Sequence, residues 1–304
     1  MNTHDWSLVL FTILAQMSVG SFVVLGIVHF LVSRSAGVEE ADRMSDRALL
    51  AIGPVLVLGL IASFFHLGNP LNAYNAIANL GSSWLSREIF SGVAFAVVGG
   101  AFAFMQWRKI GTASQRNLLG LLAALIGLVL VYSMANVYLL RTVPVWDSVL
   151  TPISFFATTF LLGTLAMGAA YVANYSYLQR KNPGCGDAQC VLLRKTLSWV
   201  GISSIVLLGV EFVVLPLYLV YLSSTPAASA ESLIAGSYST ILIVRLVLAF
   251  LGAGLFGAIV YRNAVSVGRE KVAGNWAYAA FALVLVSEIL GRFLFYATHT
   301  GFSL

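Results

Sequence analysis

Two titratable side chains mark the ends of a Gly-, Asn- and Ser-rich segment that separates two long apolar runs. His66 lies at the end of the first run, and Glu88 lies at the start of the second. If both runs are helices, the two side chains lie near the same membrane face on neighbouring helices. Ionisable groups at such a depth are energetically expensive and indicate a functional site. A pair of proton acceptors at a membrane boundary suits the oxidation of a quinol, which releases two electrons and two protons.

Each of these residues also has a structural interpretation. His66 follows Phe65 at the end of an apolar run and could be an interfacial histidine that is hydrogen-bonded to loop backbone. In the functional interpretation its imidazole bonds a quinol hydroxyl and accepts the proton, which the near-neutral pKa of histidine permits. Glu88 could stabilise the N-terminal end of the next helix, with Ser86 as the N-cap residue. Because capping and proton transfer are compatible, both remain open, and the adjacent Arg87 could hold Glu88 ionised.

A second group of polar residues lies in the last apolar run. Spacings of four place Glu288, Arg292 and Tyr296 on one stripe of a helix, with His299 close to the same face. A Glu–Arg pair at this spacing partly neutralises itself, so a buried structural ion pair is the favoured interpretation. A quinol-binding role for Glu288, Arg292 and His299 is the alternative.

Two further charges lie inside apolar runs, Glu211 in the sixth and Arg245 in the seventh. They could pair with each other or with the charges of the last run. Charge pairing inside a bundle is the simplest explanation, and a proton path is the alternative.

The composition predicts a membrane protein. Hydrophobic residues make up 59% of the 304 residues and charged residues only 10%, and the mean hydropathy is +0.90. Long unbroken apolar runs favour helices over a β-barrel, whose strands are short and alternating. We therefore predict an all-α integral membrane protein, a single polytopic domain over 1–304 with eight transmembrane helices packed as bundles. The predicted spans are 7–32, 48–66, 89–107, 118–140, 152–177, 198–222, 238–261 and 276–298.

The basic residues predict the topology. All but four of the 17 Lys and Arg residues lie in alternate loops, and the exceptions are Arg87, Arg141, Arg245 and Arg292. Because cytoplasmic loops carry an excess of Lys and Arg, both termini are predicted to be periplasmic. The segment between His66 and Glu88 is then periplasmic as well. The inner loops, such as 33–47 and 180–195, are interpreted as plain linkers.

No metal or haem is expected in this protein. Among the four histidines only His66 and His299 match in depth, and a pair at the rim is a weak haem site. Cys185 and Cys190 are too few for an iron–sulfur cluster or a disulfide scaffold.

Several runs of the sequence resemble the DMSO reductase membrane anchor subunit family (DmsC-like). The most specific run is SFFHLGNPLNAYN at 63–75, and the resemblance extends over essentially the full chain. The supporting runs are LSREI at 85–89, TVPVW at 142–146, TPISFF at 151–156, and EILGRFLFY at 288–296 followed by His299.

This resemblance implies a membrane subunit of an anaerobic respiratory complex in the bacterial inner membrane. Such a subunit oxidises menaquinol on the periplasmic side, and electrons pass to a four-cluster iron–sulfur subunit and then to a molybdopterin catalytic subunit. The resemblance associates His66 and Glu88 with the quinol site, and Phe65 would form an apolar wall of it. Arg87 stands where a smaller polar residue is expected, which could alter the charge around Glu88. The loops 67–87 and 141–150 would form the docking surface for the partners.

Three other interpretations remain open. A secondary transporter could also have eight helices with intramembrane charges, but only Pro216 resembles the helix breaks that transporters use. A purely structural anchor would hold the reductase without contacting quinol. An anchor for a polysulfide, tetrathionate or selenate reductase would share the quinol chemistry, because the terminal acceptor is selected in the catalytic subunit.

Overall fold

The computed structural model describes residues 3–64, 79–181, 187–224 and 236–300, and within these ranges the protein forms helices and turns. Inside a bilayer no water is available to bond the backbone, so a spanning segment must satisfy its own N–H and C=O groups, as a helix does. Eight of the helical segments are long and apolar enough to cross a membrane. The prediction of an all-α protein with eight such spans is confirmed.

The helices follow one another along the chain. Their bounds are α1 Thr3–Ala36, α2 Val38–Phe64, α3 Trp84–Arg108, α4 Ala113–Val137, α5 Leu150–Lys181, α6 Asp187–Ser224, α8 Ser239–Ala249, the π-helical segment η2 Phe250–Phe256, α9 Gly257–Ala264 and α10 Glu270–Thr300.

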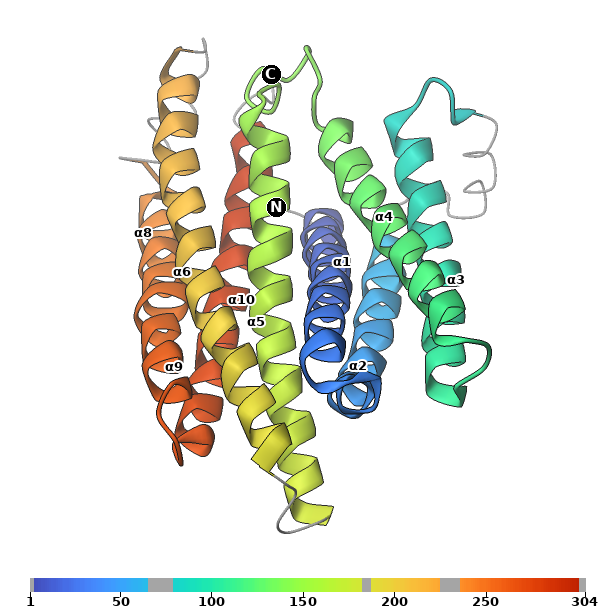
Figure 1. Ribbon diagram of the computed structural model, residues 1–304. Coiled ribbons are helices and arrows are strands. Elements are labelled where there is room, and N and C mark those ends of the chain that lie inside the picture. The colour runs from blue at the N-terminus through green and yellow to red at the C-terminus, as the bar shows by residue number, and fades with distance from the viewer. Residues whose placement is uncertain (1–2, 65–78, 182–186, 225–235, 301–304) are drawn as a thin grey trace.

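The helices form two groups that meet at α1 and α5 (Figure 1). Helices α2, α3 and α4 lie on one side, and α6, α8, α9 and α10 lie on the other. Helices α1 and α5 pack directly against each other and are the two most buried spans. Polar side chains of these two helices are therefore shielded from lipid, and charged residues on the neighbouring helices have buried partners available.

Two glycines allow α1 and α5 to approach closely. A Cβ atom on Gly20 would collide with the backbone carbonyl of Thr159, and one on Gly163 would collide with the backbone of Gly20. Small residues at a crossing are how membrane helices gain close backbone packing. This contact fixes the position of α5 relative to α1, and both helices contribute side chains to the polar groups described below.

The inner connections are shorter than predicted, because the helices continue beyond the apolar runs. Only Gly37, with φ +93°, separates α1 from α2, so the interpretation of 33–47 as a linker is wrong. The polar start of α2 is helical and carries i,i+4 and i,i+3 pairs between Arg43 and the glutamates Glu39 and Glu40. Likewise α5 continues to Lys181 and α6 begins at Asp187, so most of 180–195 is helical.

The seventh span contains a break that the sequence did not predict. Residues Phe250–Phe256 form a π-helical turn in the middle of the span, and such turns are frequent at functional sites. Ser204 of α6, which is fully buried, donates a hydrogen bond to the carbonyl of Ala253 in this turn at 3.1 Å. The turn begins five residues after Arg245 and changes the helical phase between Arg245 and α9.

Candidate functional site

Glu88 lies inside the protein and does not cap α3. The N-cap residue is Ser83, whose hydroxyl accepts from the backbone N–H of Ser86 at 3.3 Å, and the helix begins at Trp84. Glu88 therefore lies in the second turn, with 6% of its surface exposed. Both capping interpretations, Ser86 as the N-cap and Glu88 as a first-turn carboxylate, are wrong, because the helix begins five residues before the apolar run that was used to place it.

Arg87 is directed away from Glu88. Its guanidinium donates to the carbonyls of Leu80 and Gly81, both at 2.8 Å, and lies 4.2 Å above the ring centre of Trp84. Adjacent residues of a helix face different directions, so the expectation that Arg87 holds Glu88 ionised is wrong. Arg87 instead fixes the turn that leads into α3.

The two remaining residues of the predicted site, His66 and Phe65, lie outside the described residues. What the structure does describe is the environment of Glu88 on its other side. Two buried phenols, Tyr138 at the end of α4 and Tyr296 in α10, share a hydrogen bond of 2.7 Å between their hydroxyls. The carboxyl group of Glu88 lies close enough to interact electrostatically with both phenols.

Aromatic rings surround this tyrosine pair. Trp146 packs edge-on against Tyr138 and is stacked on Phe295, each with a centroid distance of 5.3 Å. The indole N–H of Trp146 donates to the backbone carbonyl of Phe295 at 2.9 Å. The turn before α5 is thereby attached to α10. We refer to the end of the bundle where α3 and α5 begin and α4 and α10 end as the Glu88 end.

The stripe on α10 is present, but its charges pair with other helices. Arg292 donates to the side-chain oxygen of Gln16 in α1 at 2.9 Å, and its guanidinium lies 3.7 Å above the ring centre of Phe155 in α5. Gln16 in turn donates to the backbone carbonyl of Phe155 at 3.2 Å. The expected ion pair between Glu288 and Arg292 is not formed, since the guanidinium is held by α1 and α5. His299 lies in the last turn of α10, and its side chain is outside the described part.

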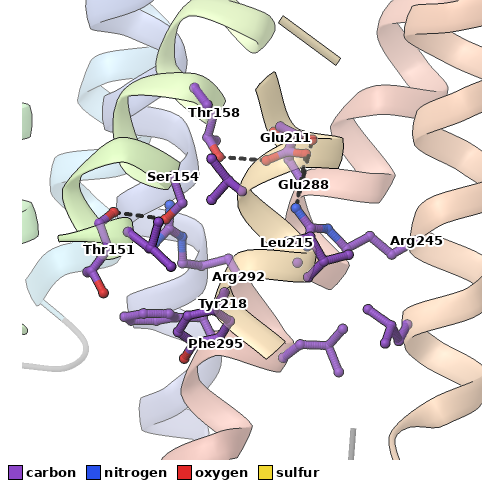
Figure 2. A pocket seen from close by; sticks show the side chains of 16 residues that line it. Thr151, Ser154, Thr158, Glu211, Leu215, Tyr218, Arg245, Glu288, Arg292 and Phe295 are labelled. Atoms are coloured by element: carbon purple, nitrogen blue, oxygen red, sulfur yellow. Dashed lines mark hydrogen bonds and ion pairs between the residues drawn. The ribbon is translucent and has the colours of Figure 1, made fainter. Parts of the chain in front are cut away.

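Glu288 instead belongs to a group that joins four helices (Figure 2). One carboxyl oxygen accepts from the Thr158 hydroxyl at 2.6 Å, and the other lies 3.8 Å from Nη2 of Arg245. The same nitrogen lies 3.8 Å from Glu211, and the carboxyl groups of Glu211 and Glu288 interact directly. The expectation that Glu211 and Arg245 pair with each other or with the α10 stripe is confirmed, because they do both.

A glycine makes room for this arrangement. A Cβ atom on Gly291 would collide with the guanidinium of Arg245. Gly291, Thr158 and Gln16 were not among the sequence candidates, because a glycine, a threonine and a glutamine in apolar runs are inconspicuous. The one available signal was the position of Gly291 directly before Arg292, inside a charged stripe.

A cavity of about 90 Å³ lies against this group. It is bordered by α5, α6, α8 and α10, and Ser154 and Tyr218 line it together with the charged residues (Figure 2). Two buried atoms beside it, a carboxyl oxygen of Glu288 and Nε of Arg292, have no hydrogen-bond partner among the described residues. This group brings two acidic and two basic side chains together inside the membrane-spanning part that the structure describes.

A separate polar cluster lies at the opposite end of α1–α4, which we call the Asp42 end. His29 Nε2 lies 2.8 Å from Asp42, and the ammonium group of Lys109 lies 2.7 Å from Asp42 and 2.8 Å from Asp46. Gln106 donates to both aspartates, at 2.7 and 2.9 Å. This cluster was not predicted from the sequence, because Asp42 and Asp46 lie in the segment that was interpreted as a linker.

Within the described ranges, no group of three or more His, Cys, Asp and Glu side chains could hold a metal ion. Cys190 lies 2.6 Å from the Tyr175 hydroxyl, and Cys185 lies outside the described residues. The described polar groups can bind protons and form hydrogen bonds with a ligand.

The amino-acid sequence was compared with those of known protein families and known proteins. The family model of the DMSO reductase anchor subunit (DmsC) matches residues 1–298. The YnfH chain of an anaerobic dimethyl sulfoxide reductase from Escherichia coli (strain K12) is 30% identical over 303 residues, covering 97% of this protein and 95% of the relative. Another anaerobic dimethyl sulfoxide reductase chain from the same organism is 28% identical over 301 residues, with the same coverage.

A more distant similarity is partial. A sulfite dehydrogenase subunit from Allochromatium vinosum is 34% identical over 150 residues, which cover 44% of this protein and 46% of the relative. The full-length matches decide the assignment: the chain belongs to the DMSO reductase anchor subunit (DmsC) family and is a multi-pass membrane subunit of a DMSO reductase-type complex.

Proposed function

We propose that this protein binds menaquinol at the Glu88 end of the bundle and oxidises it. In this proposal His66 bonds one quinol hydroxyl and accepts its proton, and Glu88 accepts the second proton or relays it to the outer surface. The two electrons leave to an iron–sulfur cluster of a partner subunit. Phe65 forms part of the apolar wall, and Arg87 acts indirectly by holding the turn before α3.

The observation that carries this proposal is the position of Glu88. Its carboxyl group is buried, takes no part in capping α3 and forms no ion pair with a described residue. A buried carboxyl group without a charged partner is expensive to keep ionised. Such a position is retained most readily where a ligand supplies a partner for the carboxyl group. A quinol hydroxyl can do so, and it then has a proton acceptor within reach.

The distribution of basic residues supports the orientation. The Asp42 end carries the loops that are rich in Lys and Arg, which indicates that it faces the cytoplasm. The Glu88 end and both termini then face the periplasm of a bacterial inner membrane. Protons from quinol are released on that side.

Partner subunits follow from the same orientation. The two full-length E. coli relatives are named as chains of a reductase, and we propose that this protein likewise joins further subunits, an iron–sulfur subunit and a molybdopterin catalytic subunit. They dock at the Glu88 end, where the turn between α4 and α5 is held in place by the bond from Trp146 to α10. This position places the first iron–sulfur cluster near the quinol.

A second candidate function is the reverse reaction, the reduction of a quinone by electrons from a dehydrogenase. The partial match to a sulfite dehydrogenase subunit favours it. The two full-length relatives are reductase chains, so quinol oxidation is the better supported direction. The anchors of polysulfide, tetrathionate and selenate reductases would use the same quinol chemistry, because the terminal acceptor is selected in the catalytic subunit.

The test compares quinol oxidation by membranes that carry the assembled complex with wild-type, His66→Arg or Glu88→Gln anchor. Glu39→Gln is the matched control, because Glu39 lies at the opposite end and its side chain is 87% exposed. We expect both site variants to lose quinol oxidation while an artificial electron donor still drives the reductase and the partner subunits stay membrane-bound. Normal quinol oxidation in both variants would make the protein a purely structural anchor, or would move the quinol site to Glu288, Arg292 and His299.

A further inference from the structure

Glu211 and Glu288 form a pair of carboxyl groups in the buried group around the cavity. They come from α6 and α10, are 8% and 2% exposed, and lie against each other (Figure 2). Two carboxylates that share a site repel each other, so one of them holds its proton more tightly. The shared cation does not remove this repulsion, because Nη2 of Arg245 is 3.8 Å from each carboxyl group, beyond hydrogen-bond distance.

The other charged and titratable groups near the pair do not remove the repulsion between the two carboxyl groups. Arg292 on α10 is turned toward Gln16 and the ring of Phe155. Tyr218 of α6 donates its hydroxyl to a backbone carbonyl at the Glu88 end, that of Val145. The side chains that α5 presents to the cavity are neutral. Arg245 is therefore the cation that forms ion pairs with both acids. Arg292 borders the same cavity and acts on Glu211 at longer range.

The cavity beside the pair is large enough for several water molecules. A buried water needs ~10–15 Å³ and two to four polar partners, and the volume here is about 90 Å³. The unpartnered atoms of Glu288 and Arg292 provide such partners, and so do Arg245 and the hydroxyl of Ser154. A gap of 3.8 Å between the members of an ion pair is also a separation at which a bridging water is expected.

We infer that Glu211 and Glu288 share one exchangeable proton inside a water-filled cavity, and that the pair is a proton-binding site of the subunit separate from Glu88. Aromatic rings separate the two sites, because Phe295 lines the cavity and packs against Tyr138, the phenol beside Glu88.

The lining of the cavity also indicates where this proton exchanges. Leu150 and Thr151 at the start of α5 border the cavity, and so does Leu242 near the start of α8. These residues lie toward the end of the bundle at which α3 and α5 begin. The proton therefore exchanges with water at the Glu88 end.

This inference rests on the contacts around the cavity and not on the quinol assignment, and infrared spectroscopy of the complete purified complex tests it directly. A protonated carboxyl group has a carbonyl stretching band that an ionised one lacks, and the band shifts when the proton is replaced by deuterium. We expect a band that shifts in D₂O without unfolding. It is lost in Glu211→Gln and in Glu288→Gln, because the single remaining carboxylate pairs with Arg245.

Two controls separate this site from the other buried acids. The band persists in Glu88→Gln, even though that variant loses quinol oxidation, and it persists in Glu270→Gln, which alters the ion pair with Arg194. If either of the first two variants fails to assemble, Thr158→Val provides the test. It removes the 2.6 Å hydrogen bond to Glu288 and should shift the band. A band that survives in both pair variants, does not respond to Thr158→Val, or does not exchange in D₂O would overturn the inference.

Discussion

Both ends of this bundle hold carboxyl groups, but the partners of these groups differ. At the Asp42 end two aspartates meet a lysine, a histidine and a glutamine at 2.7–2.9 Å. In the half toward the Glu88 end the ion pairs of Arg245 are 3.8 Å long, and Glu88 has no ion-pair partner among the described residues. Burial of charge is expensive, and it is more complete for Glu88, Glu211 and Glu288, which are buried, than for Asp42 and Asp46, which are half-buried. On this difference rests our proposal that the second group exchanges protons or ligands, whereas the first cluster stabilises the fold.

The largest effect is expected from Glu88→Gln. Because a general base typically contributes 10²–10⁴-fold to a rate, we expect quinol oxidation by the complex to fall by about 100-fold. The free energy of unfolding should change little, since the amide occupies the same volume. Turnover with a soluble quinol analogue measures the first quantity, and thermal unfolding in detergent measures the second. A large loss of stability with normal turnover would contradict this prediction, because Glu88 would then stabilise the fold as the Asp42 cluster does.

Gly291→Ala should be the most destabilising of the single changes proposed here. The added methyl group collides with the guanidinium of Arg245, which must shift and thereby disturbs its ion pairs with both carboxyl groups. Overpacking of this kind costs about 1–3 kcal/mol. Thermal unfolding of the detergent-solubilised complex measures the loss. Unchanged stability would show that Arg245 can move freely and that its ion pairs contribute little.

Asp42→Asn tests whether the cluster at the Asp42 end contributes to stability and not to quinol oxidation. It weakens the contacts to His29 and Lys109 while keeping the shape of the side chain, and we expect a loss of about 1–2 kcal/mol in stability. Quinol oxidation in the assembled complex should stay within about twofold of wild type. Measuring both quantities on one preparation is decisive, because a selective loss of turnover would assign a proton-transfer role to the Asp42 end.

The smallest effect is expected from Tyr296→Phe. This change removes the 2.7 Å hydrogen bond to Tyr138 and keeps the ring in the aromatic group, so stability should fall by about 1 kcal/mol. Chemical denaturation at a fixed detergent concentration can resolve a change of this size. A loss several times larger would indicate that the tyrosine pair stabilises the whole Glu88 end.

The sequence predicted the eight helices because their apolar runs are long and unbroken. It also predicted several site residues, because charged residues within or beside such runs are rare. Glu88, Glu211, Arg245, Glu288 and Arg292 were identified in this way. Arg245 is half-buried and the other four are buried. Their pairing was only partly predicted, since an i,i+4 spacing permits an ion pair but does not exclude a stronger partner on another helix.

Other features gave no signal in the sequence. The π-helical turn at Phe250–Phe256 looks like any other Gly-containing apolar stretch. The cluster at Asp42 was missed because hydropathy ends a helix where the polar residues begin, whereas α2 starts at Val38. Polar residues at the end of a span remain helical when they pair with one another.

The most direct test of the central claim is the binding of a fluorescent quinol-analogue inhibitor to the purified complex, titrated for wild type, Glu88→Gln and Asp42→Asn. If Glu88 forms a hydrogen bond with the quinol, the dissociation constant should rise at least about tenfold in Glu88→Gln, because about one hydrogen bond to a charged group is lost. It should stay unchanged in Asp42→Asn. Equal affinity in wild type and Glu88→Gln would contradict the placement of the quinol site at the Glu88 end.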